Sequence, residues 1–145
     1  MLIVREFRRE HLFELMKDRK EQATAGMVTS TRLNYLERNG YSRSIFDKTA
    51  KLVGICGVVP VWAHRAEGWA ILGSRASQYP ISLTKTVRRL LDFSEFKRIE
   101  ASVRVGNAAA IRWASVLGFK CEVSFMDSYF PDGEAGALFA RVKHG

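Results

Sequence analysis

The sequence predicts a mixed α/β fold in one domain, and three features of the chain carry this prediction. Its 145 residues are enough for a single hydrophobic core. The nearly continuous apolar run from Leu52 to Val61 is typical of a strand that is buried on both faces. Ala110, Trp113, Ala114 and Leu117 recur instead at the spacing of a helix that lies on a core. Because both periodicities alternate along the chain, we expect helices packed on a mixed sheet.

The helix that begins after Asn107 has clear start and stop signals. Gly106 and Asn107 make a turn, and the side-chain oxygen of Asn107 can accept an N–H group of the first helical turn. Gly118 can adopt the left-handed conformation that ends a helix. Phe119 then opens the next strand. A strand, a capped helix and a further strand are therefore expected in this order.

The other elements follow from similar patterns, in the overall order β-α-α-β-β-β-α-β-α-β-β. The second helix takes Ser30 or Thr31 as its cap and ends at Asn39 and Gly40. The expected strands are Leu2–Arg8, Ser42–Asp47, Leu52–Val61, Gly68–Gly73, Arg98–Val103, Phe119–Phe125 and Ala137–Val142, and the other helices are His11–Lys20, Thr29–Arg38 and a third that opens at Pro80.

The connections between these elements are short and contain small residues. We expect a linker at Gln22–Gly26, a hairpin turn at Ala66–Gly68 and a loop at Ser74–Tyr79. Pro131 to Gly133 reads as a turn between the last two strands. No internal repeat and no low-complexity segment interrupts this order.

The chain is basic, with 23 Lys and Arg against 15 Asp and Glu and a formal net charge of +8. Such a charge favours polyanions, which include nucleic acids and phosphorylated cofactors. The sequence has no zinc-finger spacing, no helix-turn-helix pattern and no alternation of aromatic and basic residues. A nucleic-acid partner is therefore not expected, and its only support is the basic face formed by Lys85, Arg88 and Arg89.

Cysteine usage and hydropathy indicate a protein of the cytoplasm. No apolar run approaches the roughly 20 residues of a membrane helix, and the first residues lack the pattern of a signal peptide. Cys56 and Cys121 both lie among strand-like apolar residues, so we expect two reduced thiols in the core. The 3 His are scattered, and no metal site is expected.

The segment around the fourth helix resembles a motif of the GNAT superfamily, the acetyl-CoA-dependent N-acetyltransferases. Its pattern, N-x-x-A-I followed by a closing G-F, is matched by Asn107, Ala110, Ile111, Gly118 and Phe119. The order of elements over nearly the whole chain is also that of the GNAT fold. The resemblance implies a single domain over residues 1–145, with a mixed, mostly antiparallel central sheet, splayed strands and about four flanking helices.

The same resemblance implies that acetyl-CoA lies between strands Gly68–Gly73 and Arg98–Val103, with its pyrophosphate at the start of the helix near Pro80. The chain departs from the family here, because the segment from Gly73 to Pro80 has no second glycine. Arg75 could still offer a forked guanidinium to a phosphate, although a solvated loop would look the same. The expected cofactor-binding residues are Leu72, Gly73, Ser74, Arg75, Ser77, Gln78, Asn107 and Ile111, with Lys85 as a further candidate.

A carboxylate is the expected base for the acceptor amine. Glu67, at the start of the strand that leads to the cofactor loop, is the first candidate, because such glutamates recur in the family. A glutamate beside a turn can equally be an ordinary solvated residue. His64 and, more distantly, Glu100 are the alternatives.

A hydroxyl group is the expected proton donor for the leaving thiolate. Where GNAT enzymes often carry a tyrosine four residues before the closing glycine, this chain has Ala114. Tyr129 and Tyr79 could replace that tyrosine from loops. Glu67 and Tyr129 are therefore the predicted catalytic residues.

The sequence thus predicts an N-acetyltransferase that moves an acetyl group from acetyl-CoA to an amine on a small molecule or a protein. The alternative is a catalytically inactive GNAT-fold protein with a structural or host-interaction role. Some small proteins of tailed bacteriophages, which also look like diverged GNAT domains, share a stretch like Val105–Arg112. The last strand pair is, in addition, a candidate for pairing with a second copy in a homodimer.

Overall fold

The structure is a computed structural model that describes residues 1–18 and 29–144. The expected linker Gln22–Gly26 and the last residues of the expected first helix, beyond Asp18, lie outside the described residues.

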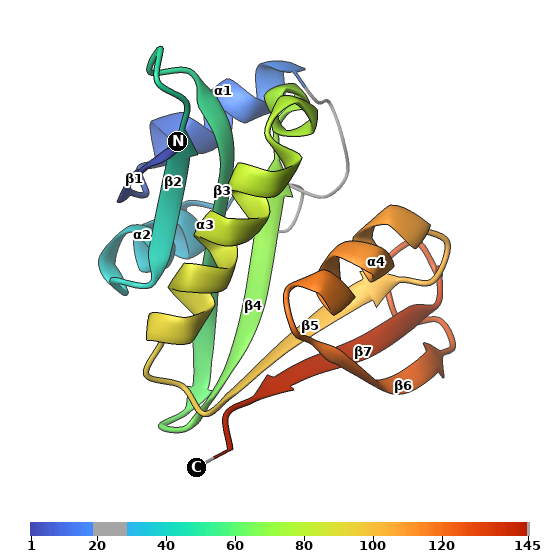
Figure 1. Cartoon of the computed structure of the whole chain (residues 1–145). Coiled ribbons are helices and arrows are strands. Elements are labelled where there is room, and N and C mark those ends of the chain that lie inside the picture. Colours follow the sequence, from blue (N-terminus) through green and yellow to red (C-terminus); the bar gives the residue numbers. More distant parts are fainter. Residues whose placement is uncertain (19–28, 145) are drawn as a thin grey trace. The chain divides into compact units, whose positions relative to one another are not determined.

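Seven strands and four α-helices form the described part of the chain, in the order expected from the sequence (Figure 1). A short 3₁₀ helix, η2, lies before the third α-helix. The elements are β1 (Ile3–Glu6), α1 (Arg9–Asp18), α2 (Ser30–Arg38), β2 (Ser42–Phe46), β3 (Leu52–Trp62), β4 (Arg65–Leu72), η2 (Ser74–Gln78), α3 (Pro80–Phe93), β5 (Arg98–Arg104), α4 (Ala108–Val116), β6 (Lys120–Met126) and β7 (Gly136–Val142).

The strands form one sheet in the order β1-β2-β3-β4-β5-β7-β6. The β1–β2, β2–β3, β5–β7 and β6–β7 pairs are antiparallel, whereas β4 and β5 are parallel. The ladder between β4 and β5 joins Arg65–Glu67 to Arg98–Glu100, and in the described part of the chain it stops there. The mixed, mostly antiparallel sheet predicted from the sequence is confirmed.

The chain divides into two compact units, which we describe separately. The first unit comprises Met1–Val59 and Trp69–Leu83, and the second comprises Pro60–Gly68 and Thr84–Gly145. The long elements β3, β4 and α3 contribute residues to both units. The assignment of all residues to one domain stays a prediction.

In the first unit, the apolar stripes of α1 and α2 pack against β3 and β4. Gly73 follows β4 where the helix comes very close, because a Cβ atom there would lie 2.7 Å from the Leu15 Cδ2. The buried core consists of Phe7, Leu12, Leu15, Leu33, Leu36, Leu52, Ile55 and Ile71.

In the second unit, basic side chains of β7 and of the residue after it contact the ends of α3 and α4. The Arg141 Nε donates to the Leu117 carbonyl at the end of α4, 3.0 Å away, and its guanidinium pairs with Asp92 of α3. The Lys143 Nζ donates to the Asp92 carbonyl, also 3.0 Å away. Cations suit these positions, because the last carbonyl groups of a helix lack partners within it.

The predicted caps of α4 are confirmed, and that of α2 is shifted by one residue. The Asn107 Oδ1 accepts from the Ala110 N–H at 3.0 Å, and Gly118 has a φ of +98°. In α2 the cap is Thr29, whose Oγ1 accepts from the Arg32 N–H at 3.3 Å. The prediction of Ser30 or Thr31 was wrong because all three residues are hydroxyl residues and only the backbone selects among them.

Two further sequence predictions are corrected. The hairpin turn after β3 lies at residues 63–64 rather than at Ala66–Gly68. Gly68 lies inside β4, where a Cβ atom would come within 3.2 Å of the Ile99 Cγ2, so this glycine permits close strand packing rather than a turn. Residues 74–78, expected as part of a loop, form η2.

The two cysteines differ, although both were expected in the core. Cys56 is buried in β3, whereas Cys121 is exposed on β6, which is the last strand of the sheet order.

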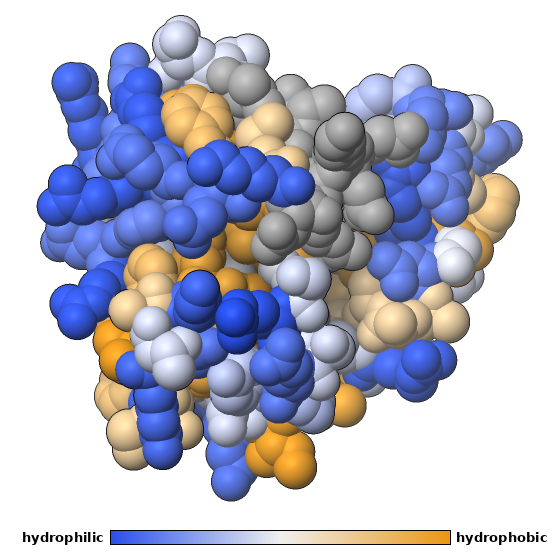
Figure 2. Space-filling model, turned by 90° about the horizontal axis from the view of Figure 1, so that it is seen from above, coloured by the Kyte–Doolittle hydropathy of each residue, from blue (hydrophilic) through white to orange (hydrophobic). Residues whose placement is uncertain are grey.

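Hydrophilic residues make up most of the face shown in Figure 2, with apolar residues in separate patches between them. None of the described helices is long and apolar enough to cross a membrane.

Candidate active site

The expected cofactor segment begins where β4 ends, in the first unit. The Gly73 N–H donates to the Val53 carbonyl at 2.9 Å, so this backbone group belongs to the contact with β3. The close approach of the chain to Leu15 and to the Val53 carbonyl gives Gly73 a structural reason to be glycine. The glycine here therefore does not, by itself, indicate a phosphate site.

Residues 74–78 form a tight helical turn instead of an open glycine loop. The Ala76 N–H donates to the Gly73 carbonyl and the Tyr79 N–H donates to the Ala76 carbonyl, both at 3.1 Å. The Ser77 hydroxyl donates to the Ser74 carbonyl at 3.3 Å. Several polar groups of the segment are thus used within it, and side chains must supply much of any contact with a phosphate.

A buried carboxylate directly after β2 accepts hydrogen bonds from a residue of this turn and from the residue that follows it. Asp47 is only 1% exposed, and its Oδ2 accepts from the Tyr79 hydroxyl at 3.1 Å and from the Arg75 Nη1 at 3.3 Å. Its Oδ1 accepts from the Thr49 hydroxyl and the Thr49 N–H, at 2.6 and 2.8 Å, and from the Lys51 N–H at 3.1 Å. The hydrogen bonds from Thr49, its hydroxyl foremost, and those from Lys51 and Tyr79 lower the pKa of Asp47 to about 2.

The contacts of Asp47 occupy two residues that the sequence suggested for chemistry. Burial and the hydrogen bond to Asp47 raise the pKa of Tyr79, which makes this phenol a poorer proton donor near neutral pH. Arg75 keeps an open side, because its side chain is 36% exposed and only one nitrogen contacts the carboxylate. A guanidinium has five N–H groups, so Arg75 can still bind an anion.

The start of α3 lies directly after this turn. Pro80 is its first residue, as predicted, and the Leu83 N–H donates to the Tyr79 carbonyl at 2.9 Å. The first turn of an α-helix has N–H groups without partners inside the helix, and these attract anions. Lys85 is exposed one turn further along.

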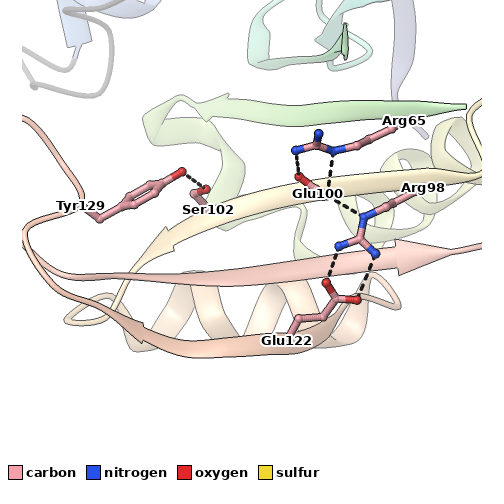
Figure 3. Close-up of polar contacts among 6 residues, drawn as sticks. All are labelled: Arg65, Arg98, Glu100, Ser102, Glu122 and Tyr129. Carbon is pink, nitrogen blue, oxygen red and sulfur yellow. Dashed lines mark hydrogen bonds and ion pairs between the residues drawn. The ribbon is translucent and has the colours of Figure 1, made fainter. Parts of the chain in front are cut away.

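In the second unit, four charged side chains link three strands (Figure 3). Arg65 of β4 donates twice to Glu100 of β5, from Nη2 at 2.8 Å and from Nε at 2.9 Å. The Arg98 Nε donates to the same carboxylate at 2.6 Å, and its guanidinium reaches Glu122 of β6, with the Nη1 at 3.1 Å. β7 lies between β5 and β6 in the sheet, and the small Ala140 stands opposite Glu100 there.

Glu100 is therefore held as an anion and is a poor candidate for a base. Glu100 is 7% exposed. The hydrogen bonds from Arg65 contribute most to lowering its pKa, and the hydrogen bond from Arg98 acts in the same direction. A base must take up a proton during the reaction, and both guanidinium groups oppose that step. His64, the other alternative, is exposed in the hairpin turn.

Glu67 stands opposite Glu100 in the parallel ladder and is exposed. Neighbouring residues in a ladder point to the same face of the sheet, as do residues two apart along a strand. Glu67, Glu100 and Ser102 consequently share one face of the second unit. This face is the one on which Figure 3 draws the charged network.

Tyr129 reaches this same face from the loop between β6 and β7. Its hydroxyl lies 2.9 Å from the Ser102 hydroxyl, and the two groups share a hydrogen bond (Figure 3). Its ring packs over Gly136, where a Cβ atom would lie 2.9 Å from the Tyr129 Cδ2. Tyr129 is 47% exposed, so its hydroxyl is held in position while the residue remains accessible.

An arginine at the end of β5 fixes the loop that carries Tyr129. The Arg104 Nη1 donates to Glu134 at 2.6 Å and to Asp132 at 2.8 Å. Its guanidinium carbon also lies 4.4 Å from the centre of the Phe130 ring, which is a cation–π contact. Three side chains of one loop are thus gathered around a single guanidinium.

The α4 helix offers no hydroxyl at the position where one was sought. Ala114 is 6% exposed and belongs to the core. Asn107 uses its side-chain oxygen as the helix cap, and Ile111 is half-buried one turn later. Trp113 donates its indole N–H to the Thr84 hydroxyl at 3.1 Å.

The predicted site residues thus form two groups, one in each unit. The first unit holds Leu72, Gly73, Ser74, Arg75, Ser77 and Gln78, and the second holds Glu67, Asn107, Ile111 and Tyr129. Sequence reasoning missed Asp47, Ser102 and Arg104. Their hydrogen bonds to Arg75, Tyr79, Tyr129, Asp132 and Glu134 join residues 27 to 32 positions apart along the chain, and no local pattern marks such pairs.

Three solved structures show what this arrangement of elements is similar to. A chimera of the spermidine N-acetyltransferase SpeG from Vibrio cholerae and hSSAT superposes with a TM-score of 0.73 at 19% identity, covering 97% of this chain and 95% of that one. Ard1 from Thermoplasma volcanium gives 0.75 at 15% identity and covers 99% of both chains. A GNAT-family acetyltransferase from Bacillus anthracis gives 0.70 at 14% identity, covering 97% and 94%.

This chain has the GNAT fold. At these low identities the likeness concerns the fold alone. No family model matches the sequence, and no curated protein matches it. Among the described residues, no group of three or more His, Cys, Asp or Glu side chains could hold a metal ion.

Proposed function

We propose that this protein transfers an acetyl group from acetyl-CoA to the amine of a small molecule or a protein. One observation carries the proposal beyond the fold. An exposed carboxylate, Glu67, and a hydroxyl pair, Tyr129 with Ser102, share one face of the second unit. Glu67 stands opposite Glu100, and Ser102 lies two residues beyond Glu100 on β5. The hydroxyl pair is therefore about 7 Å from the position of Glu67 along the strands.

These groups match the two proton movements of amine acylation. The acceptor must lose a proton before its nitrogen can attack a thioester, and the departing thiolate must gain one. Glu67 would take up the first proton, and Tyr129 would donate the second, with Ser102 orienting its hydroxyl. Help of this kind typically accelerates a reaction about 10²–10⁴-fold.

The residues of the first unit suit the phosphates of coenzyme A in their donor chemistry. Arg75 offers a charged fork, and Ser74, Ser77 and Gln78 offer polar side chains beside the start of α3. Leu72 and Gly73 would flank the pantetheine arm. In the second unit, Asn107 and Ile111 stay predictions that rest on the sequence resemblance. When bound, acetyl-CoA supplies the activated acetyl group.

An inactive GNAT-fold protein is the second candidate, and two observations favour it. Ala114 leaves α4 without a hydroxyl at the position where GNAT enzymes often carry a tyrosine, and the turn before α3 engages the Ala76 and Tyr79 N–H groups in hydrogen bonds of its own. A structural or host-interaction protein, including a phage-encoded one, would need neither a hydroxyl at this position of α4 nor an open loop for a cofactor. Homodimerisation through the last strand pair also stays a prediction.

The test is the release of free thiol from acetyl-CoA across a panel of amines that includes polyamines, amino acids and peptides. The protein should release thiol with at least one amine. Glu67→Gln and Tyr129→Phe should each lower kcat by at least tenfold without lowering the melting temperature. Glu122→Gln, which alters an exposed carboxylate on β6, is the matched control. A folded protein that releases no thiol with any amine would favour the inactive candidate.

A further inference from the structure

The two carboxylate oxygens of Asp47 serve different parts of the first unit. The three donors on Oδ1 belong to Thr49 and Lys51, in the turn that directly follows β2. The two donors on Oδ2 come from Arg75 and Tyr79, which lie 28 and 32 residues further along the chain. The local turn is therefore complete without Oδ2, and the second oxygen is available to hold the segment before α3.

This arrangement supplies what the sequence of the segment lacks. A phosphate-binding loop usually relies on glycines that let the backbone approach the anion, and residues 74–79 contain none. Such a segment needs another constraint, and Asp47 restrains it at two points. Arg75 lies inside η2, and Tyr79 lies directly before the first residue of α3.

We propose that Asp47 is a positioning residue for cofactor binding, which orients the Arg75 guanidinium toward the phosphates of coenzyme A. This inference rests on the proposed function. Asp47 itself does not touch the cofactor, because it is 1% exposed. It acts through Arg75, whose side chain is 36% exposed and has N–H groups beyond the one that contacts the carboxylate.

A buried carboxylate near an anion site has two opposing effects. Its negative charge weakens the attraction of Arg75 for a phosphate, whereas its hydrogen bond fixes where the guanidinium points. Five donors spread the charge of Asp47, while an asparagine would turn an N–H group toward donors that need an acceptor. Loss of orientation should therefore outweigh the gain in net charge when Asp47 becomes asparagine.

The experiment is a double-mutant cycle on the binding of coenzyme A, measured by calorimetry on the full chain. Asp47→Asn and Arg75→Ala should each weaken binding about tenfold, the loss expected from one charge-assisted contact. The double variant should bind no more weakly than Arg75→Ala alone, because Asp47 acts through that side chain. Glu37→Gln is the matched control, since it breaks another arginine contact of the first unit, the one to Arg9 on α1.

A second ligand separates positioning from a general loss of folding. Pantetheine, which has no phosphates, should bind the wild type and Asp47→Asn equally well by ligand-observed NMR. An equal loss for pantetheine and coenzyme A would overturn the inference, and so would losses that multiply in the double variant. Unchanged binding of coenzyme A by Asp47→Asn would overturn it while leaving the proposed function intact. A wild type that binds no coenzyme A would overturn both.

Discussion

Replacing Glu100 with glutamine should destabilise the protein without removing its base. The substitution takes away the anion that two guanidinium groups share and leaves Arg65 and Arg98 facing a neutral amide. Breaking a fully buried ion pair from one side costs about 3–5 kcal/mol. Here the arginine side chains are 33% and 28% exposed, so water compensates for part of the loss. We expect a loss of about 2 kcal/mol in the free energy of unfolding.

Thermal unfolding measures this loss directly. For a chain of this length, 2 kcal/mol corresponds to a fall in melting temperature of about 6 °C. Glu122→Gln is the control, because that carboxylate is 41% exposed and, among the described residues, pairs with one arginine, Arg98, so its loss should be much smaller. Thiol release by Glu100→Gln, measured below its melting temperature, should stay close to wild type.

The pH dependence of stability checks the sign of the same interaction. The pKa of Glu100 is lower in the folded protein than its ordinary value of 4.5, so the unfolded chain binds the proton more tightly. Its contribution is complete above pH 4.5 and is lost as the pH falls through the lowered pKa. The difference in stability between wild type and Glu100→Gln should accordingly shrink below pH 4.5. A melting temperature unchanged by the substitution, or a difference that grows in acid, would refute the reasoning.

Three other predictions follow from single residues. Burial lowers the pKa of His11 below 6.5, so wild type should lose stability relative to His11→Gln as the pH falls below 6.5, measured by urea unfolding at pH 7.5 and pH 5. Cys121 is exposed and should react with iodoacetamide in the native protein, whereas Cys56, whose pKa burial raises to about 12, should react only after unfolding, as read by mass spectrometry. Gly118→Ala should cost about 1 kcal/mol, because its φ is +98° and an added Cβ would lie 3.0 Å from the Arg141 Nε.

Predictions that depend on near neighbours in the chain agreed best with the structure. The cap at Asn107, the left-handed Gly118 and the start of α3 at Pro80 each rest on interactions within a few residues. The order of strands and helices was also predictable, because hydrophobic periodicity reports which face of each element is buried.

The errors arose where one residue type serves two purposes. Gly68 resembled a turn residue, yet it allows β4 to lie close to Ile99 of β5. Cys121 resembled a core residue because its neighbours are apolar, but β6 ends the sheet order and its side chain there is exposed. A glycine or an apolar run does not by itself reveal which neighbour the fold brings to it.

The candidate site was the least predictable part, because it depends on distant pairs. Arg75 and Tyr129 were predicted from a resemblance, whereas their partners, Asp47 and Ser102, come from strands far away in the sequence. Ordinary residue types at ordinary positions carry no signal of such pairing. Only the folded chain shows that Asp47 and Ser102 hold these two side chains.

The most direct test of the central claim is a calorimetric titration of the folded wild-type protein with acetyl-CoA. We expect micromolar binding that Arg75→Ala weakens. A titration that shows no binding at millimolar acetyl-CoA would contradict the acetyltransferase proposal and would leave the inactive GNAT-fold protein as the better description.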